Sequence, residues 1–231
     1  MMNELLAGLR SLDWSPLWIS LKTACITTVI CFFLGIFLAQ KLGKWKEPWQ
    51  SIVDSVLTLP MVLPPTVAGY FLLLLFSKRR PVGIFLFSHF GIKVVQSFLG
   101  CVLAATVISL PLMYRNAKAS FALVPKDLVQ AGRTLGLSET KIFWKIILPL
   151  SGPGILSGAV LSFARALGEY GATSMLAGNI PGKTATISQR IALVMQDQDY
   201  VTAGVWVGVV LLISLFCMTG LQLLSKRSSS R

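Results

Sequence analysis

Residues 129–150 read VQAGRTLGLSETKIFWKIILPL, a basic and weakly amphipathic segment in the middle of a very hydrophobic chain. Apolar runs flank it on both sides, at residues 98–117 and 151–166. A helix needs about 20 mostly apolar residues to cross the ~30 Å hydrocarbon core of a bilayer, and these runs approach or reach that length. We therefore expect residues 129–150 to stand outside the membrane, between two membrane helices.

The composition of the whole chain supports a membrane location. Of its 231 residues, 54% are hydrophobic and 13% are charged, against roughly 25% charged residues in an ordinary soluble domain. The net charge of +12 could indicate a nucleic-acid-binding protein, but the Lys and Arg residues are scattered in short loops between apolar segments. We therefore expect no nucleic acid as a partner, and contact with membrane lipid instead.

Five windows are apolar enough to cross the membrane: residues 17–40, 56–76, 98–117, 151–166 and 203–224. A sixth, residues 187–195, is short and is interrupted by Gln189 and Arg190, so we expect an external loop or a short helix there. The first window is too long for a cleavable signal peptide and should stay in the membrane. The sequence predicts an all-α integral membrane protein with about five transmembrane helices, six being possible.

The distribution of Lys and Arg gives an orientation in the cell membrane. Cytoplasmic loops carry an excess of these residues, and this bias favours an N-terminus outside and a cytoplasmic C-terminus. Lys78, Arg79 and Arg80 then lie outside and oppose the assignment, but the reverse orientation would export the most basic central segment. We expect an external segment (1–16), a transmembrane domain (17–224) that includes a cytoplasmic segment (125–149), and a cytoplasmic tail (225–231).

The cytoplasmic segment predicts a pair of short helices between the third and fourth spans. The first would run from residue 126 to about 135, where Gly136 permits the turn that ends it. The second would run from residue 139 to about 147, with Ser138 as its N-cap and Pro149 ending it. Such a pair could fit a groove on a partner protein, or it could lie on lipid headgroups.

The spacing within this segment resembles the EAA signature of permease subunits of binding-protein-dependent (type I) ABC importers. That signature is a triplet, a glycine separated from it by three residues, and an I-x-L-P ending that begins ten positions after that glycine. The matching positions are Gln130, Ala131, Gly132, Gly136, Ile146, Leu148 and Pro149. Gln130 replaces the acidic residue and Gly132 the second alanine. The resemblance implies that the two helices couple this chain to a separate ATPase subunit.

Three further stretches are similar to molybdate-type permeases: DSVLTLPMVLPPTVAGYFLLLLF (54–76), SFARALGEYGAT (162–173) and NIPGKTATIS (179–188). The resemblance implies a permease subunit for a tetrahedral oxyanion, most of all molybdate, with sulfate and tungstate permeases as relatives. It implies a homodimer, two ABC ATPase subunits and an external substrate-binding protein as partners. ATP and Mg would be bound by the ATPase, so we expect no catalytic residue, cofactor or metal on this chain.

Three prolines, at positions 60, 64 and 65, interrupt the second apolar window. Each removes a backbone N–H and clashes with the preceding turn, so we expect a kinked or broken helix. Such breaks often mark the substrate path of a transporter, and Pro64, Pro65 and Gly69 become candidates for that path. The alternative is a helix that begins at the membrane surface with its prolines in the first turn.

Arg165 and Glu169 are four residues apart at the end of an uncharged run, hence on one face of a helix. Charges at such a depth are expensive unless they are paired or hydrated. We expect them to pair with each other, or across the dimer axis, and to stabilise one state of a gate. The alternative is that Arg165 transiently contacts a passing divalent oxyanion.

Other function classes find little support. Residues 177–184, AGNIPGKT, approach a phosphate-binding loop but lack its first glycine and a preceding strand. His89 is the only histidine, which leaves little material for histidine-based metal or nucleophile sites. A secondary transporter would use buried carboxylates and an internal repeat, and the chain has no clear repeat. The sequence therefore favours the passive half of an importer driven by a partner.

Overall fold

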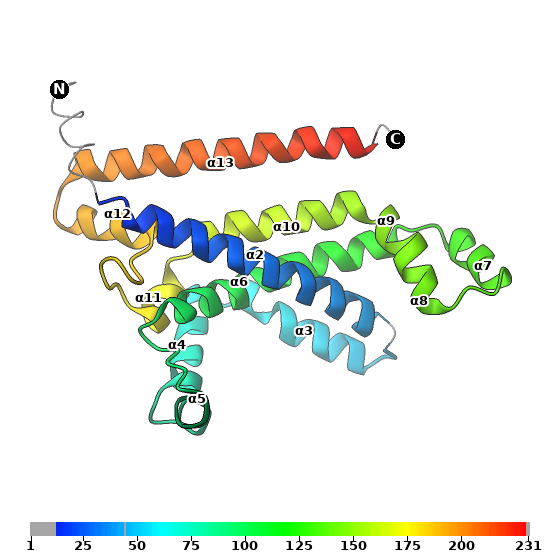
Figure 1. The fold of residues 1–231 in the computed structure, drawn as a ribbon, viewed down its shortest axis with the longest axis horizontal. Helices are drawn as coiled ribbons and strands as arrows, with labels where there is room; N and C mark the ends of the chain where they lie inside the picture. The colour runs from blue at the N-terminus through cyan, green and yellow to red at the C-terminus, as the bar shows by residue number, and fades with distance from the viewer. Residues whose placement is uncertain (1–12, 44, 230–231) are drawn as a thin grey trace.

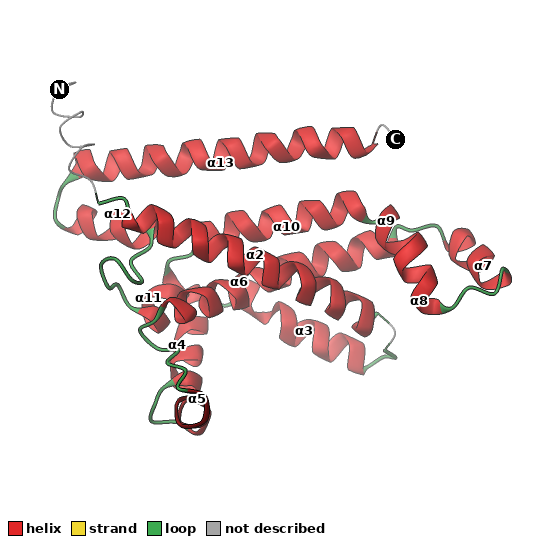
Figure 2. Cartoon of the chain, in the orientation of Figure 1, coloured by secondary structure: helices red, strands yellow, loops and turns green. Residues whose placement is uncertain are grey.

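The computed structural model describes residues 13–43 and 45–229, with the side chains of residue 218 and residues 221–229 outside the description. All regular secondary structure in this part of the chain is helical (Figure 2). The prediction of an all-α protein is thereby confirmed. Most of the predicted external segment, residues 1–12, and the last two residues of the predicted tail lie outside the described residues.

The centre of the molecule is a bundle of α2 (Ser15–Leu42), α6 (Phe98–Ala122) and α10 (Gly152–Leu167), which contact one another extensively. Lipid tails are as apolar as the side chains of membrane helices, so no hydrophobic driving force brings the helices together. The helices associate by close packing instead, and small side chains allow their backbones to approach. Gly35 shows this best, since a Cβ there would lie 2.6 Å from Cγ of Met113. The buried contacts along the bundle include Ala24, Cys31, Ala105, Ala117, Ala159 and Ala166.

The C-terminal part of the chain packs on one side of this bundle (Figure 1). The short helix α12 (Ile187–Gln196) begins with a capping box between Thr186 and Gln189, and it precedes the long apolar helix α13 (Tyr200–Ser229). The sixth apolar window, for which we expect a loop or a short helix, is therefore a short helix. Helix α13 packs against both α10 and α12 and accounts for the last predicted span.

The second predicted span is broken into α3 (Trp49–Val62) and α4 (Pro65–Phe76), which meet at an angle of 114°. Pro65 is the first residue of α4, where its missing N–H and fixed φ angle are tolerated. The predicted break is confirmed. The alternative that placed all three prolines in a first turn is wrong for Pro60, which lies in the last turn of α3.

A second bend, of 71°, lies between the helical segment Glu139–Leu150 and α10. The chain runs from α8 (Glu139–Ile142) through a π-helical turn, η1 (Phe143–Ile147), into α9 (Leu148–Leu150). The sequence predicts a helix to about residue 147 that Pro149 ends, and this prediction is wrong because the helical backbone continues to Leu150. Pro149 is the second residue of α9, where a proline is tolerated, so the chain bends only at Ser151.

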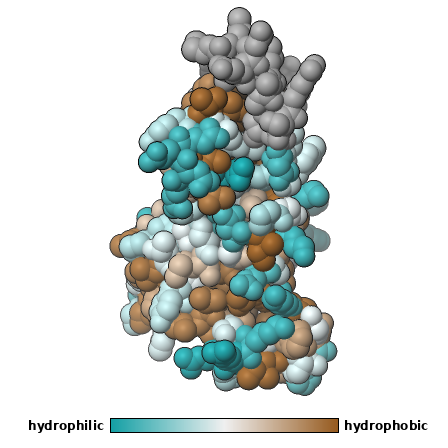
Figure 3. Space-filling view, turned by 90° about the vertical axis from the view of Figure 1, so that its left-hand side faces the viewer, coloured by the Kyte–Doolittle hydropathy of each residue, from teal (hydrophilic) through white to brown (hydrophobic). Residues whose placement is uncertain are grey.

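The bundle has two distinct ends along its long axis (Figure 1). The α2–α3 connection, α7 (Lys126–Thr134) and α8 lie at one end, whereas α5 (Pro81–Phe90), α11 (Gly171–Ala177) and α12 lie at the other. Hydrophilic patches interrupt the hydrophobic surface at this second end (Figure 3). Three described helices are long and apolar enough to cross a membrane, or five spans if each bent pair counts as one. The chain is therefore a multi-pass membrane protein.

Candidate functional site

A tight turn at Gly136 joins the helices α7 and α8. Helix α7 ends at Thr134, and Gly136 adopts the left-handed conformation with a φ of 74°. The Leu137 N–H donates to the Gly132 carbonyl at 3.0 Å, and the Gly136 N–H donates to the Arg133 carbonyl at 2.9 Å. These two bonds form a Schellman motif, which satisfies carbonyls left open at a helix end. The predicted role of Gly136 as a helix stop is confirmed.

The two helices of this pair touch at Gly132. A Cβ added to Gly132 would lie 3.0 Å from Cδ1 of Ile146 and 3.3 Å from Cγ1 of Ile142, and both Gly132 and Ile142 are buried. A glycine in the third position of the triplet therefore lets α7 lie close against the α8–η1 segment. Gln130 and Ala131 of the same triplet are exposed.

Polar contacts reinforce the turn. The Ser138 hydroxyl accepts a hydrogen bond from the Lys141 N–H at 3.4 Å, so it caps α8 as predicted. Arg133 reaches across to Glu139 with two bonds, Nε to Oε1 at 2.7 Å and Nη2 to Oε2 at 3.2 Å. Hydrogen bonding to this carboxylate raises the pKa of the Arg133 guanidinium.

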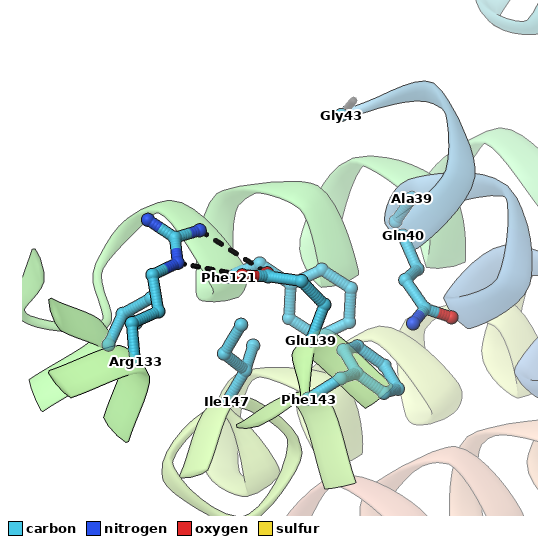
Figure 4. A pocket seen from close by; sticks show the side chains of 9 residues that line it. Ala39, Gln40, Gly43, Phe121, Arg133, Glu139, Phe143 and Ile147 are labelled. Atoms are coloured by element: carbon cyan, nitrogen blue, oxygen red, sulfur yellow. Dashed lines mark hydrogen bonds and ion pairs between the residues drawn. The ribbon is translucent and has the colours of Figure 1, made fainter. Parts of the chain in front are cut away.

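The helix pair is fixed to the membrane bundle by aromatic packing. Phe121 of α6 and Phe143 of η1 meet edge to face with ring centroids 5.5 Å apart. Beside them a groove of about 480 Å³ separates the pair from the end of α2 (Figure 4). It is lined by Ala39, Gln40, Gly43, Phe121, Val129, Arg133, Glu139, Phe143 and Ile147. A movement of the helix pair would thus be transmitted directly to α6.

Two features of this end were not predicted from the sequence. The first is a set of large apolar side chains on the helix pair that face outward, namely Leu128, Leu135 and Trp144, of which Leu135 is 80% exposed. Exposed apolar patches of this kind commonly mark contact sites for partners. The sequence does give one indication for Leu135. It directly precedes Gly136, which ends the helix, so it lies at a turn.

The second unpredicted feature is a polar cluster that holds α3 against α6. The Asp54 carboxylate of α3 accepts hydrogen bonds from the Tyr114 hydroxyl and from Nζ of Lys118, both on α6. The Asp54 and Lys118 side chains are about one-quarter and one-third exposed. Sequence gives no signal for this cluster, because its partners are 60 or more positions apart along the chain.

Arg165 and Glu169 form the ion pair that their spacing predicts, with Nη1 of Arg165 2.6 Å from Oε2 of Glu169. The expected common helical face is wrong, because α10 ends at Leu167 and Glu169 lies beyond it. The other oxygen of Glu169 accepts a hydrogen bond from the Ala172 N–H at 2.8 Å, at the start of α11. The carboxylate thus connects the end of α10 to the start of the next helix.

Arg165 also lines a cavity of about 160 Å³ at the break between α3 and α4. The cavity lining consists of Pro60, Met61, Leu63, Pro65, Ile108, Leu112 and Arg165. The structure thus brings two predicted path residues, Pro65 and Arg165, to one space. Pro64 is the N-cap of α4, while Gly69 is buried against α11, where a Cβ would lie 2.7 Å from the Ala172 Cα.

Comparisons with known proteins agree with this architecture. Residues 31–229 match the family described as "Binding-protein-dependent transport system inner membrane component". The solved structure of a bacterial ABC transporter involved in the import of the acidic polysaccharide alginate superposes with a TM-score of 0.80 at 15% identity. That superposition covers 97% of this chain and 83% of the other. At this identity the likeness shows the fold alone.

The chain therefore belongs to the family of inner membrane components of binding-protein-dependent transport systems. Within the family it is 43% identical over 184 residues to the molybdenum transport system permease protein ModB of Escherichia coli K12, covering 80% of each chain. It is 30% identical over 243 residues to the sulfate transport system permease protein CysT of Salmonella typhimurium, covering 100% of this chain and 87% of that protein.

Proposed function

We propose that this chain is the permease subunit of an ATP-driven importer and forms the membrane path for molybdate. The observation that carries the proposal is the 43% identity with a molybdenum transport permease over 80% of both chains. Sulfate is the second candidate, because a sulfate permease aligns over the full chain at lower identity. Tungstate, as a third tetrahedral oxyanion, would use the same path.

We further propose that the helix pair of residues 125–149 docks on an ABC ATPase subunit. The triplet Gln130, Ala131 and Gly132, with Gly136, shapes the first helix, and Ile146, Leu148 and Pro149 connect the second to α10. The exposed Leu135 and Trp144 would enter the partner's groove. ATP and Mg would be bound by the ATPase, and this chain would bind no cofactor and contribute no catalytic residue.

The assembly that we propose contains two copies of this chain, two ATPase subunits and an external binding protein. The helix pair would face the cytoplasm, with the N-terminus outside and the C-terminus inside. The path would run past the proline break at Pro64 and Pro65 and past Arg165 and Glu169, with Gly69 packing α4 against α11. Closure at this level would form a gate between the two sides.

The substrate is tested by uptake in cells that lack their own molybdate permease. The chain is expressed with its ATPase and its binding protein, and accumulation of radiolabelled molybdate is measured with and without excess sulfate or tungstate. We expect molybdate uptake that tungstate inhibits more strongly than sulfate. Restored sulfate uptake without molybdate uptake would show that the substrate assignment is wrong.

The orientation is tested separately with single cysteines in place of Lys141 and Lys183. An impermeant thiol reagent added to intact cells should label the Lys183→Cys chain and should label Lys141→Cys only after the cells are opened. The native exposed cysteine, Cys25, is replaced by serine in both chains to remove background labelling. The reverse pattern would invert the proposed topology.

A further inference from the structure

We propose that Arg165 is a transient binding station for a divalent tetrahedral oxyanion inside the membrane, and that Glu169 competes with the anion for its guanidinium. This inference rests on the proposed function, because it concerns the anion that the permease carries. The station is the cavity of about 160 Å³ at the break between α3 and α4.

The position of the cavity suits a point on the path. Two of its lining residues, Ile108 and Leu112, lie near the middle of the spanning helix α6, and four others lie at or beside the proline break. Among the described residues that line it, Arg165 is the one that carries a charge. An intramembrane cation next to a helix break is a functional candidate on energetic grounds, since it is costly to keep there.

The guanidinium has donors available for an anion. It carries five N–H groups, and the ion pair with Glu169 is formed at Nη1, one of its three nitrogens. The Arg165 side chain is 33% exposed, so part of it faces open space. The first residue of α4, Pro65, lines the same cavity, and the partial positive charge of that helix N-terminus adds to the attraction for an anion.

Glu169 differs from Arg165 in being held in place. Its side chain is 1% exposed, and one carboxylate oxygen is fixed by the Ala172 N–H while the other faces Arg165. Between transport events this carboxylate neutralises the charge of Arg165. When a dianion binds, the three groups together carry a net charge of minus two, so the anion is held weakly. A transport path needs such a weak site, because the ion must leave as easily as it enters.

The proposal predicts opposite effects of removing the two charges. Glu169→Gln keeps a side chain of the same shape that can accept the Ala172 hydrogen bond, but it removes the competing negative charge. At distances of a few ångströms such a charge acts strongly, so oxyanion binding should tighten roughly tenfold or more. Release should then slow, and the maximal rate of uptake should fall. Arg165→Gln should abolish binding at this station.

The test uses the complex of this chain with its ATPase subunits, purified without the binding protein. Equilibrium binding of radiolabelled molybdate is measured for the unchanged complex, Glu169→Gln, Arg165→Gln, and the surface control Arg79→Gln. Uptake rates are measured for the same variants in proteoliposomes that contain the binding protein. We expect tighter binding with slower uptake for Glu169→Gln, lost binding for Arg165→Gln, and unchanged values for the control.

Equal losses of uptake in both variants, with unchanged anion binding, would assign the pair a purely structural role and overturn the proposal. If Arg165→Gln fails to assemble, Arg165→Lys replaces it; it keeps the charge but loses the bidentate geometry, and several-fold weaker binding is expected. Unchanged binding in both Arg165→Lys and Glu169→Gln would also overturn the station. An unchanged complex that imports no oxyanion would instead refute the proposed function.

Discussion

Gly132 lies against Ile146, so close that a Cβ on the glycine would stand 3.0 Å from the isoleucine Cδ1. This contact joins α7 to the segment that continues into α9 and then bends into α10. The two short helices therefore behave as one body rather than as two loosely tethered pieces. Such a body can transmit a push from a partner to the membrane helices.

Replacing Gly132 with valine should separate the two helices and reduce coupled transport. The added methyl groups have no room beside Ile142 and Ile146, and overpacking of this kind typically costs about 1–3 kcal/mol. We expect uptake to fall at least several-fold at equal membrane expression, as measured by immunoblot. Gly152→Ala is the matched control, because a Cβ at Gly152 meets nothing within 4 Å. Equal effects of the two substitutions would argue against the contact.

Gly136→Val should disrupt the turn for a different reason. The φ of 74° is unfavourable for residues with a Cβ by about 1–2 kcal/mol, and β-branched residues suffer most. Gly136→Asn should retain most activity, since asparagine tolerates this conformation. The measurement is co-purification of the ATPase with each variant in detergent. Full ATPase recovery with the valine variant would disprove the docking role of this turn.

The cluster of Asp54, Tyr114 and Lys118 should control the attachment of α3. Val53 and Leu57 of α3 pack, partly buried, against the core of the bundle, and this cluster adds polar contacts between α3 and α6. Asp54→Ala should lower the free energy of unfolding by an amount on the order of 1 kcal/mol, because the Lys118 ammonium then loses its carboxylate acceptor. Tyr114→Phe, which removes one neutral donor, should cost less.

A double-mutant cycle separates this pairing from general damage to the helices. If Asp54 and Lys118 interact, the loss in the double alanine variant is smaller than the sum of the two single losses. Strictly additive losses would mean that the two side chains do not interact in the assembled protein.

The Arg133–Glu139 pair should, by contrast, contribute little to stability. Both side chains are more than half exposed, and exposed ion pairs are worth about 0–1 kcal/mol and weaken further in salt. Arg133→Gln should therefore leave the unfolding temperature nearly unchanged in 0.15 M salt, the physiological ionic strength. A large drop would show that the partner subunit, or a further contact of Glu139, depends on this arginine.

Much of the fold could be read from the sequence because the bilayer imposes simple rules on length and polarity. The apolar windows correspond to α2, the α3–α4 pair, α6, α10 and α13, and Gly136 ends its helix as its conformational freedom suggests. Contacts between residues that lie far apart along the chain could not be predicted from the sequence. The partners of Asp54 and the contact of Gly132 with Ile146 depend on how helices pack, and one chain's spacing does not contain that information.

Two local details also escaped prediction, each because a neighbouring segment overrides a local rule. Glu169 lies beyond the end of α10, yet it still reaches Arg165 because the start of α11 holds its carboxylate. Pro149 does not end its helix, because the preceding π-helical turn lets it enter a new short helical segment. In both cases the local sequence predicts the wrong helix end, because contacts with a neighbouring segment or the preceding backbone conformation determine it.

The π-helical turn at Phe143–Ile147 has a consequence for the direction of the force between subunits. A turn of this kind holds one residue more than an α-helical turn, and each residue corresponds to about 100° of rotation around the helix axis. The rotation of α7 and α8 about the helix axis, relative to α10, thus depends on the number of residues in this turn. Deleting one residue here would rotate α7 and α8 by about 100° relative to α10 and would misalign the contacts that Phe143 makes with Phe121 and Ile146 makes with Gly132.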